Sequence, residues 1–245
     1  MHFIILEEVD STNSYVSRHS GELSDGTMVV AMTQTAGRGQ RGNSWESAPG
    51  ENLTATLFHR PTGIEPRRQF AISEAVALAV ADYLRDEGIP ATVKWPNDIY
   101  VGDRKISGIL IEHSVTSQAI EHSRIGIGLN VNQEQFESDA PNPVSMMQLT
   151  GMRRDISRTA AAVGARLEKK LAMATDPEGR EQLHRDLTAS LWRGDGKPYR
   201  FRRRSDGSVF EGIIVAVDPE GPITIEDTAK GLKETFLFKE VEFIL

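Results

Sequence analysis

A loop rich in glycine and arginine, residues 37–42, is the stretch of this sequence whose composition best suits an anionic ligand. It lies between two apolar runs, residues 28–32 and 53–58, that predict strands. Three glycines let the backbone adopt positive φ and approach a ligand, while arginines and consecutive N–H groups favour a phosphate or a carboxylate. The spacing matches neither the Gly-Lys-Ser/Thr phosphate loop nor the Gly-x-Gly-x-x-Gly nucleotide loop. A solvated hairpin loop would have the same composition, so both interpretations stay open.

Two further segments carry side chains suited to the same chemistry. Lys105 begins an otherwise apolar strand predicted over residues 105–111 and is followed closely by Gly108. It is either a sheet-edge charge in water or a group that faces a ligand. Just before this strand, a proline removes a backbone donor and predicts a bend at which Asn97 and Asp98 project.

Residues 125–132 alternate large apolar residues with glycine or asparagine. With the two-residue period of a strand, the apolar side chains share one face, and the other face carries Gly126, Gly128, Asn130 and Asn132. A face with so little side-chain bulk predicts a flat ligand lying on the sheet. Close helix packing on the glycines is the alternative, but it leaves the asparagines unexplained.

Strands and helices are predicted around these motifs. Residues 2–9 predict a strand, and residues 10–13 supply N-cap chemistry for the helix that follows. Such a helix start directs free N–H groups beyond the strand, although a plain capping role for Ser11 or Thr12 is the simpler interpretation. Residues 70–84 are apolar nearly all round, which predicts a helix buried against a sheet.

The pattern changes in the last quarter of the chain. After a connection at residues 139–151, two amphipathic helices are predicted, the second beginning at the Asp176-Pro177 pair. Short strands with turn signals then predict an SH3-like β module over residues 195–245. A run of three arginines, residues 202–204, suggests nucleic-acid contact, but this module has 8 Lys and Arg against 10 Asp and Glu. We therefore expect the run to be a solvated strand end.

Composition limits the classes of protein that fit. A chain of 245 residues allows one large domain and a small one. The net charge of −7 argues against a protein whose main role is to bind nucleic acid, and the lack of cysteine excludes disulfides, thiolate metal sites and a cysteine nucleophile. The apolar runs are too short for a signal peptide or a membrane span, so we expect a cytoplasmic protein with no membrane partner.

Five motifs, in one order along the chain, resemble those of the biotin protein ligases. They are residues 9–13, 34–42, 94–98, 105–110 and 128–132. The resemblance covers residues 1–194 and implies an α+β fold, with a mixed sheet flanked by helices as in the class II synthetase-like biotin and lipoate ligases. The C-terminal β module fits the same family. We thus expect a catalytic domain at residues 1–194 and an SH3-like domain at residues 195–245.

The resemblance implies a reaction in two steps. The carboxylate of biotin attacks the α-phosphate of ATP, which gives biotinyl-5′-AMP and pyrophosphate. A lysine of a biotin carboxyl carrier protein domain, part of a biotin-dependent carboxylase, then attacks the mixed anhydride and expels AMP. Because the first step brings two anions together, fixed positive charge and aligned N–H groups should promote it. Mg²⁺ should arrive with ATP, held mainly by phosphate oxygens.

Site residues follow from the same resemblance. The expected catalytic residues are Arg38, Lys105 and Asp98. The expected biotin-binding residues are Ser11, Thr12, Asn13, Gln34, Gly37, Arg38, Gly39, Gln40, Lys105 and Gly108. The expected ATP-binding residues are Arg38, Gln40, Arg41, Trp45, Asn97, Lys105 and Asn130. For Asp98 two roles stay open, one on the magnesium ion and one as a base toward the acceptor lysine.

The sequence also departs from some members of the family. Gln40 stands where some relatives have arginine, and Asn43 where some have a basic residue. The loop should therefore hold the phosphates less tightly. Trp45 should cover the adenine or lock the loop, whereas Trp95 is better explained as core.

Regulatory members carry an N-terminal helix-turn-helix domain, for which the signature near residue 9 leaves no room. We expect no sequence-specific DNA binding, and a homodimer stays open. A lipoate or octanoate ligase of the same fold is the first alternative, although its Arg-Arg-x-x-Gly-Gly-Gly loop is not found. A non-catalytic biotin or adenylate sensor is the second, but it should have lost Lys105 or Arg38.

Overall fold

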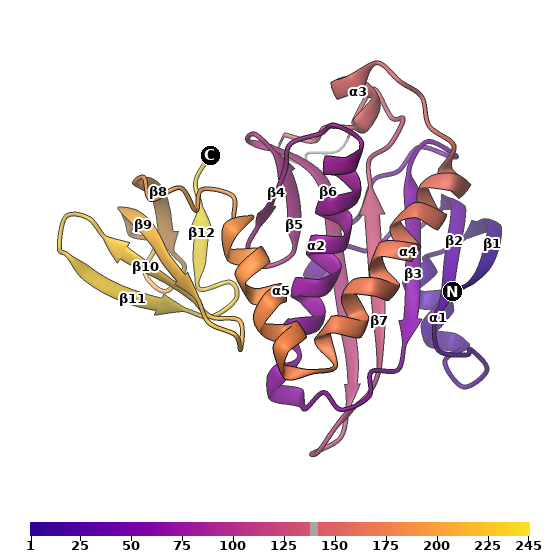
Figure 1. The fold of residues 1–245 in the computed structure, drawn as a ribbon. Helices are drawn as coiled ribbons and strands as arrows, with labels where there is room; N and C mark the ends of the chain where they lie inside the picture. Colours follow the sequence, from indigo (N-terminus) through magenta and orange to yellow (C-terminus); the bar gives the residue numbers. More distant parts are fainter. Residues whose placement is uncertain (138–141) are drawn as a thin grey trace.

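The computed structural model describes residues 1–137 and 142–245 and contains a seven-stranded sheet with the order β1-β2-β3-β7-β6-β5-β4 (Figure 1). Strands β1 and β2 are parallel, and every other neighbouring pair is antiparallel. The predicted mixed sheet is therefore confirmed. The strands are β1 (His2–Val9), β2 (Thr27–Gln34), β3 (Leu53–His59), β4 (Ala91–Lys94), β5 (Asp98–Val101), β6 (Arg104–Val115) and β7 (Ile120–Leu129).

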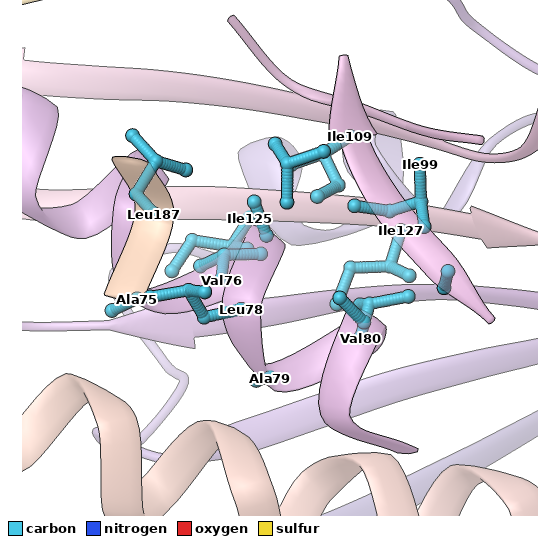
Figure 2. Close-up of a cluster of buried hydrophobic side chains, with 14 of the residues drawn as sticks. Ala75, Val76, Leu78, Ala79, Val80, Ile99, Ile109, Ile125, Ile127 and Leu187 are labelled. Carbon is cyan, nitrogen blue, oxygen red and sulfur yellow. The ribbon is translucent and has the colours of Figure 1, made fainter. Parts of the chain in front are cut away.

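Three helices cover one face of this sheet: α2 (Phe70–Asp86), α4 (Ile156–Ala174) and α5 (Pro177–Ala189). Helix α2 is apolar nearly all round because it contacts strands on one side and both α4 and α5 elsewhere. Figure 2 shows its side chains beside Ile125 and Ile127 of β7 and isoleucines of β5 and β6. The predicted buried helix is confirmed, and it continues two residues beyond residue 84.

The opposite face carries helix α1 (Thr12–Arg18), which contacts β2, β3 and β7. Residues of β2 alternate between the two faces, as the strand period requires. Met28 and Val30 belong to the main core, whereas Val29 packs with Val16 of α1 and Phe58 of β3 in a small second cluster. Helix α1 is short, so the sheet beyond it on this face is left for the cleft described below.

The last fifty residues form a five-stranded antiparallel sheet with the order β11-β10-β9-β8-β12. Its strands are β8 (Tyr199–Arg203), β9 (Val209–Val217), β10 (Ile223–Asp227), β11 (Leu232–Phe236) and β12 (Val241–Phe243). The indole Nε1 of Trp95 donates a hydrogen bond to the carbonyl of Gly221 at 2.8 Å, and one hydrophobic core runs through both sheets. This small module, seen beside β4 and α5 in Figure 1, is thus packed directly against the larger sheet.

Some elements differ from the prediction. Strand β7 ends at Leu129, so Asn130 and Asn132 lie beyond the sheet rather than on its face. A short helix, α3 (Met146–Thr150), follows within the predicted connection, part of which (residues 139–141) lies outside the described residues. Its capping box, in which Ser145 and Gln148 bond to each other's backbone N–H, is a sequence signal that could have located it.

Two 3₁₀ turns complete the secondary structure, η1 (Gln40–Gly42) and η2 (Pro66–Arg68). The peptide bond between Trp95 and Pro96 is cis, at the break between β4 and β5. In the described part of the chain, none of the helices has the length and apolar character needed to cross a membrane.

Candidate active site

A cleft of about 1450 Å³ opens on the face of the seven-stranded sheet that carries α1. Strands β3, β6 and β7 form its floor, the glycine-rich loop flanks it, and residues of the C-terminal module form another wall. The lining includes these expected site residues: Ser11, Thr12, Asn13, Gln34, Arg38, Gly39, Gln40, Trp45, Asn97, Asp98, Lys105, Gly108 and Asn130. The topology therefore gathers residues that are far apart in the sequence into one cavity.

Among the expected residues whose side chains the structure describes, only Gly37 does not line the cleft. The side chain of Arg41 lies outside the described part of the structure. Gly37 instead closes the loop, because its carbonyl accepts a hydrogen bond from the N–H of Trp45 at 3.0 Å. A Cβ atom at position 37 would lie 2.5 Å from the carbonyl oxygen of Trp45, so only glycine fits there. A second bond, from the N–H of Gly39 to the carbonyl of Asn43 at 2.7 Å, makes the loop a closed hairpin.

A flat group packs on the glycines of the floor, but it is a side chain of the protein itself. The indole of Trp45 lies so close to Gly128 that a Cβ atom there would overlap the ring. At the neighbouring Gly108, a Cβ atom would come within 2.9 Å of Cζ3 of the same ring. Trp45 Nε1 is buried and has no hydrogen-bond partner among the described residues. Trp45 thus packs its indole onto the glycines of the floor, and the two roles expected for it stay predictions.

The asparagines that follow β7 have separate functions. Asn130 lines the cleft, and its Nδ2 donates to the carbonyl of Val144 at 3.0 Å. Asn132 does not line the cleft, because both ends of its side-chain amide bond to the backbone of Arg154 at 2.8 Å. The prediction that both asparagines share a ligand-facing surface is therefore wrong for Asn132.

The start of α1 contributes buried polar groups to the cleft. Ser11 is the N-cap residue, but its side chain makes no capping hydrogen bond, so the plain capping interpretation is wrong for Ser11. The N–H and Oγ1 of Thr12 both donate to Oε1 of Gln34, at 2.8 and 3.2 Å. Thr12 Oγ1 also lies 2.9 Å from Oγ1 of Thr56 on β3. These bonds fix the helix start, the end of β2 and the floor relative to one another.

Asn13 presents an unsatisfied donor to this site. Its Nδ2 is buried without a hydrogen-bond partner in the part of the chain that the structure describes, and it lies beside the Cα hydrogens of Gly126. Its Oδ1 accepts a hydrogen bond from Arg38 Nη1 at 3.4 Å. A buried donor left unpaired costs about 1–3 kcal/mol, so an acceptor oxygen on a ligand would relieve that cost here.

Arg38 reaches across the cleft to a carboxylate that sequence reasoning missed. Its Nη2 lies 3.2 Å from Oε1 of Glu112 on β6, and Arg124 of β7 lies 3.5 Å from the other oxygen of that carboxylate. The Arg38 side chain stays nearly half exposed and can therefore meet a ligand. Glu112 had no sequence signal of its own, because the pairing of β6 with β7 brings it to Arg124 and the fold of the glycine-rich loop brings it to Arg38.

Lys105 and Asp98 form an ion pair in the cleft, with 2.7 Å between Nζ and Oδ1. The pairing of β5 with β6 contains an irregularity between Ile99 and Tyr100, which brings the two side chains to the same place. The neighbouring Asn97 donates its Nδ2 to the carbonyl of Ile109 and so fixes the turn that carries Asp98. Lys105 therefore lines the cleft beside a carboxylate and is not a sheet-edge charge in water.

Lys94 is a further cleft residue that sequence reasoning did not select. Its Nζ lies 3.3 Å from the hydroxyl of Tyr100 and within 6 Å of the ring centres of Tyr100, Trp192 and Phe243. Burial lowers the pKa of Lys94 and raises the pKa of the Tyr100 hydroxyl. The cage depends on Phe243, which comes from the C-terminal module, so no local pattern could have predicted it.

The arginine run at residues 202–204 is also different from the prediction. Arg203 is 13% exposed, lies over the ring of Phe210 at 3.9 Å and pairs with Asp227 at 3.1 Å. Arg202 and Arg204 point the other way, as alternate residues of a strand do, and both line the cleft. The run is therefore not simply a solvated strand end.

The residues that the structure describes have little capacity to bind a metal ion. Within residues 1–137 and 142–245, no group of three or more His, Cys, Asp or Glu side chains is placed to hold a metal ion. Asp98 lies in the cleft, but one of its oxygens is paired with Lys105.

Comparison with known proteins gives the family. The profile of the Biotin/lipoate A/B protein ligase family matches residues 5–130, about half of the chain. The bifunctional ligase/repressor BirA of Salmonella typhimurium is 35% identical over 231 residues, which cover 91% of this chain and 68% of that protein. The chain belongs to the biotin/lipoate A/B protein ligase family.

Further members narrow the type of enzyme. The biotin–[acetyl-CoA-carboxylase] ligase of Paracoccus denitrificans is 35% identical over 154 residues, which are 60% of this chain and 63% of that protein. The biotin protein ligase of Aquifex aeolicus, solved in complex with biotin and ATP, has a TM-score of 0.82 and 26% identity, with 98% of this chain and 97% of that chain covered. The chain spans about two thirds of the length of the two sequence relatives. These similarities make it an enzyme of the biotin ligase type.

Proposed function

We propose that this chain joins biotin to ATP as biotinyl-5′-AMP and then transfers the biotinyl group to a lysine of a biotin carboxyl carrier protein domain. The observation that carries the proposal is the convergence of Asn13, Arg38 and the Lys105–Asp98 pair on one cleft. The name of the Paracoccus relative points to a carboxylase as the source of the acceptor domain. Residues 1–194 would act as the catalytic domain and residues 195–245 as the SH3-like domain that closes the cleft.

In the first step, a carboxylate oxygen of biotin forms a bond to the α-phosphorus while the bond to the bridging oxygen breaks, and pyrophosphate leaves with the electron pair. Arg38 and Lys105 supply cations beside the path of attack and offset the repulsion between the two anions. The unpaired Nδ2 of Asn13 supplies a donor to an oxygen of biotin. The polar residues Ser11, Thr12 and Gln34 would border the same ligand.

In the second step, the acceptor amine attacks the carbonyl carbon of the mixed anhydride, and AMP leaves. The amine must lose a proton, and Asp98 is the carboxylate of the cleft that is paired with Lys105. Once Lys105 turns toward the phosphate, Asp98 can accept that proton as a general base. The alternative role of Asp98, on the magnesium ion, predicts that its loss would slow the first step as well.

The residues of the cleft suit a Mg²⁺ ion that enters together with ATP better than a metal ion that the protein holds permanently. Asp98 is a single carboxylate already paired with a lysine, and the described residues offer no cluster of acidic or histidine ligands. Mg²⁺ commonly keeps several waters and binds through one or two carboxylates together with phosphates. When bound, the ion neutralises phosphate charge, whereas this chain's own cations orient the α-phosphate and the carboxylate.

Biotin-dependent exchange of labelled pyrophosphate into ATP tests the first step. We expect exchange with biotin and a background rate with lipoate or octanoate. Exchange driven by lipoate or octanoate would favour the lipoate ligase alternative, and binding of biotin without exchange would favour the sensor. Transfer to a purified carrier domain, followed by mass spectrometry, tests the second step.

Other parts of the proposal concern partners. We infer a cytoplasmic protein that has no membrane partner and no sequence-specific DNA target, and a net charge of −7 supports the last point because DNA binding relies on neutralising phosphates. A gel shift at moderate salt that showed nanomolar binding to a defined operator would contradict it.

A further inference from the structure

Two charged residues, Glu112 and Arg124, lie just beyond the end of the cleft floor. Arg124 is two positions from Gly126 on β7, and Glu112 is two positions from Leu110 on β6, so both share the face of the sheet that the cleft occupies. They are direct partners in the pairing of the two strands. Neither of them lines the cleft. They are therefore placed to act on the site through a residue that does.

Arg38 is that residue. Oε1 of Glu112 accepts a hydrogen bond from Nη2 of Arg38 at 3.2 Å. Oε2 lies 3.5 Å from Nη2 of Arg124 and is buried without a hydrogen bond in the part of the chain that the structure describes. The exposed fraction of the side chain falls from 45% at Arg38 to 30% at Glu112 and 22% at Arg124. Because water screens the inner pair less, that pair can keep its geometry while Arg38 stays accessible to a ligand.

Helix α1 holds the far end of this row. Nη1 of Arg124 donates a hydrogen bond to Oγ of Ser17, which lies one helical turn after Asn13 on the same side of α1. Oδ1 of Asn13 accepts from Nη1 of Arg38 at 3.4 Å. The contacts thus close into a ring that runs from the glycine-rich loop through β6 and β7 to α1 and back. Both terminal nitrogens of Arg38 are bound within it, one by Asn13 and one by Glu112.

We infer that Glu112 and Arg124 are positioning residues that orient the guanidinium of Arg38 for the formation of biotinyl-AMP. This inference rests on the proposed function. A long side chain that is nearly half exposed samples many rotamers, yet a cation promotes the reaction only where charge develops. Glu112 restricts Arg38 to one orientation. Arg124 fixes Glu112 in turn and offsets part of its charge, so that an anionic ligand can compete for Arg38.

A double-mutant cycle in the full chain tests this role. We expect Glu112→Gln to slow the formation of biotinyl-AMP in a single turnover roughly tenfold, measured per folded molecule. In the Arg38→Gln background the same substitution should change the rate by about twofold or less, because no guanidinium is left to orient. Glu121→Gln is the matched control, since it removes the same charge from an exposed position of the β6–β7 hairpin outside the cleft lining.

A second variant, Arg124→Gln, decides the matter if Glu112→Gln fails to fold. Its loss of rate should be a few-fold and should likewise disappear when Arg38 is absent. Equal losses with and without Arg38 would show that the two residues only stabilise the fold, and that result would overturn the inference. A native rate in both variants would do the same.

NMR relaxation of the Arg38 Nε–H in the empty protein measures positioning without any ligand. We expect the Nε–H to move with larger amplitude in Glu112→Gln than in the native chain, and to be unaffected in Glu121→Gln. Equal mobility in Glu112→Gln and the native chain would contradict the inference. If Arg38 becomes more mobile as expected but the native chain shows no biotin-dependent exchange of pyrophosphate, the proposed function fails while the positioning of Arg38 stands.

Discussion

The two faces of the seven-stranded sheet use the same strands for opposite purposes. On β7, Ile125 and Ile127 are buried against α2, whereas Gly126 and Gly128 face the cleft. On β3, Leu57 belongs to the main core, whereas Thr54 and Thr56 line the cleft. One face is filled by the chain's own helices and the other is left polar and shallow.

This difference shows how the alternation of a strand separates stability from chemistry. A residue on the helix face is bounded by fixed neighbours, so its loss leaves a cavity. A residue on the cleft face borders a space that solvent or a ligand can occupy, so its loss changes what binds there. Substitutions on the two faces should therefore have separable effects on the free energy of unfolding and on turnover.

The largest effect is expected on the cleft face, from Lys105→Ala. Loss of a cation placed beside the reacting anions should slow formation of biotinyl-AMP by about 10²–10³-fold while leaving the free energy of unfolding nearly unchanged. Arg104→Ala is the matched control, since it removes the exposed positive charge of the preceding residue. A single-turnover assay with labelled ATP measures the rate, and a native rate in the variant would show that Lys105 has no part in the first step.

On the helix face, Ile125→Ala should do the reverse. Ile125 is fully buried and lies outside the cleft lining, and loss of most of such a side chain costs about 2–5 kcal/mol in unfolding free energy. Urea unfolding measures the loss, and turnover per folded molecule should stay near the native value. Ile5→Ala, at a 54% exposed position on β1, is the control and should cost far less. A large fall in turnover with native stability would break the distinction between the two faces.

The Arg38 variant should have an effect of middle size, and the property affected should be how tightly the protein retains biotinyl-AMP. Arg38→Gln removes the charge that reaches Asn13 and Glu112, so the complex with biotin or its adenylate should weaken by roughly tenfold. Activated biotin should then leak onto free lysine in solution. Arg18→Gln, in the exposed pair with Asp10, is the control. Leakage that is equal in both variants would remove Arg38 from this role.

The same loop should respond to its ligand. We expect residues 36–45 to exchange amide hydrogens faster in the empty protein than with biotin or a non-hydrolysable adenylate, because ordering over the ligand would exclude water from the mixed anhydride. The reference segment is α2, which should show no change. Equal protection with and without ligand would indicate a loop that is already formed, as the hairpin bonds of Gly37 and Gly39 would allow.

The smallest effect concerns a buried acid behind the sheet. Burial raises the pKa of Glu74 from 4.5 to about 7, although His184 opposes this through a hydrogen bond of 2.7 Å. Because the folded state holds the proton more tightly than the unfolded state, unfolding free energy should fall as the pH rises from about 4.5 to 7. Glu74→Gln should flatten that dependence, and Glu22→Gln at an exposed position should not. An unchanged slope in Glu74→Gln would place its cause elsewhere.

Periodicity predicted much of the fold because it reports local burial. The all-round apolar pattern of α2 and the alternation of Ile125, Gly126 and Ile127 both reflect the environment of consecutive residues, and both are seen in the structure. The Asp176-Pro177 start of α5 is equally local, since Oδ1 of Asp176 accepts from the N–H of Gly179 at 2.9 Å.

What the sequence did not predict depends on contacts between distant segments. Glu112 joins the site only because it lies beside Arg38, 74 positions away, and Trp45 of the loop covers Gly128, which lies on β7. The division of the arginine run required knowing that Asp227 would face Arg203. The expected roles of the site residues stay predictions, because proximity in the cleft does not by itself assign a function.

The hydrogen bond from Trp95 to Gly221 has a consequence for cooperativity. Trp95 is 5% exposed, and beside it Phe70 lies against Gly221 while Trp192 packs against Phe243. These contacts join the C-terminal module to the turn that carries Asp98, so the module and the cleft should melt in a single calorimetric transition whose van't Hoff and calorimetric enthalpies agree. A chain cut after residue 194 would expose this aromatic surface to water, and it should then self-associate rather than persist as an independent monomer.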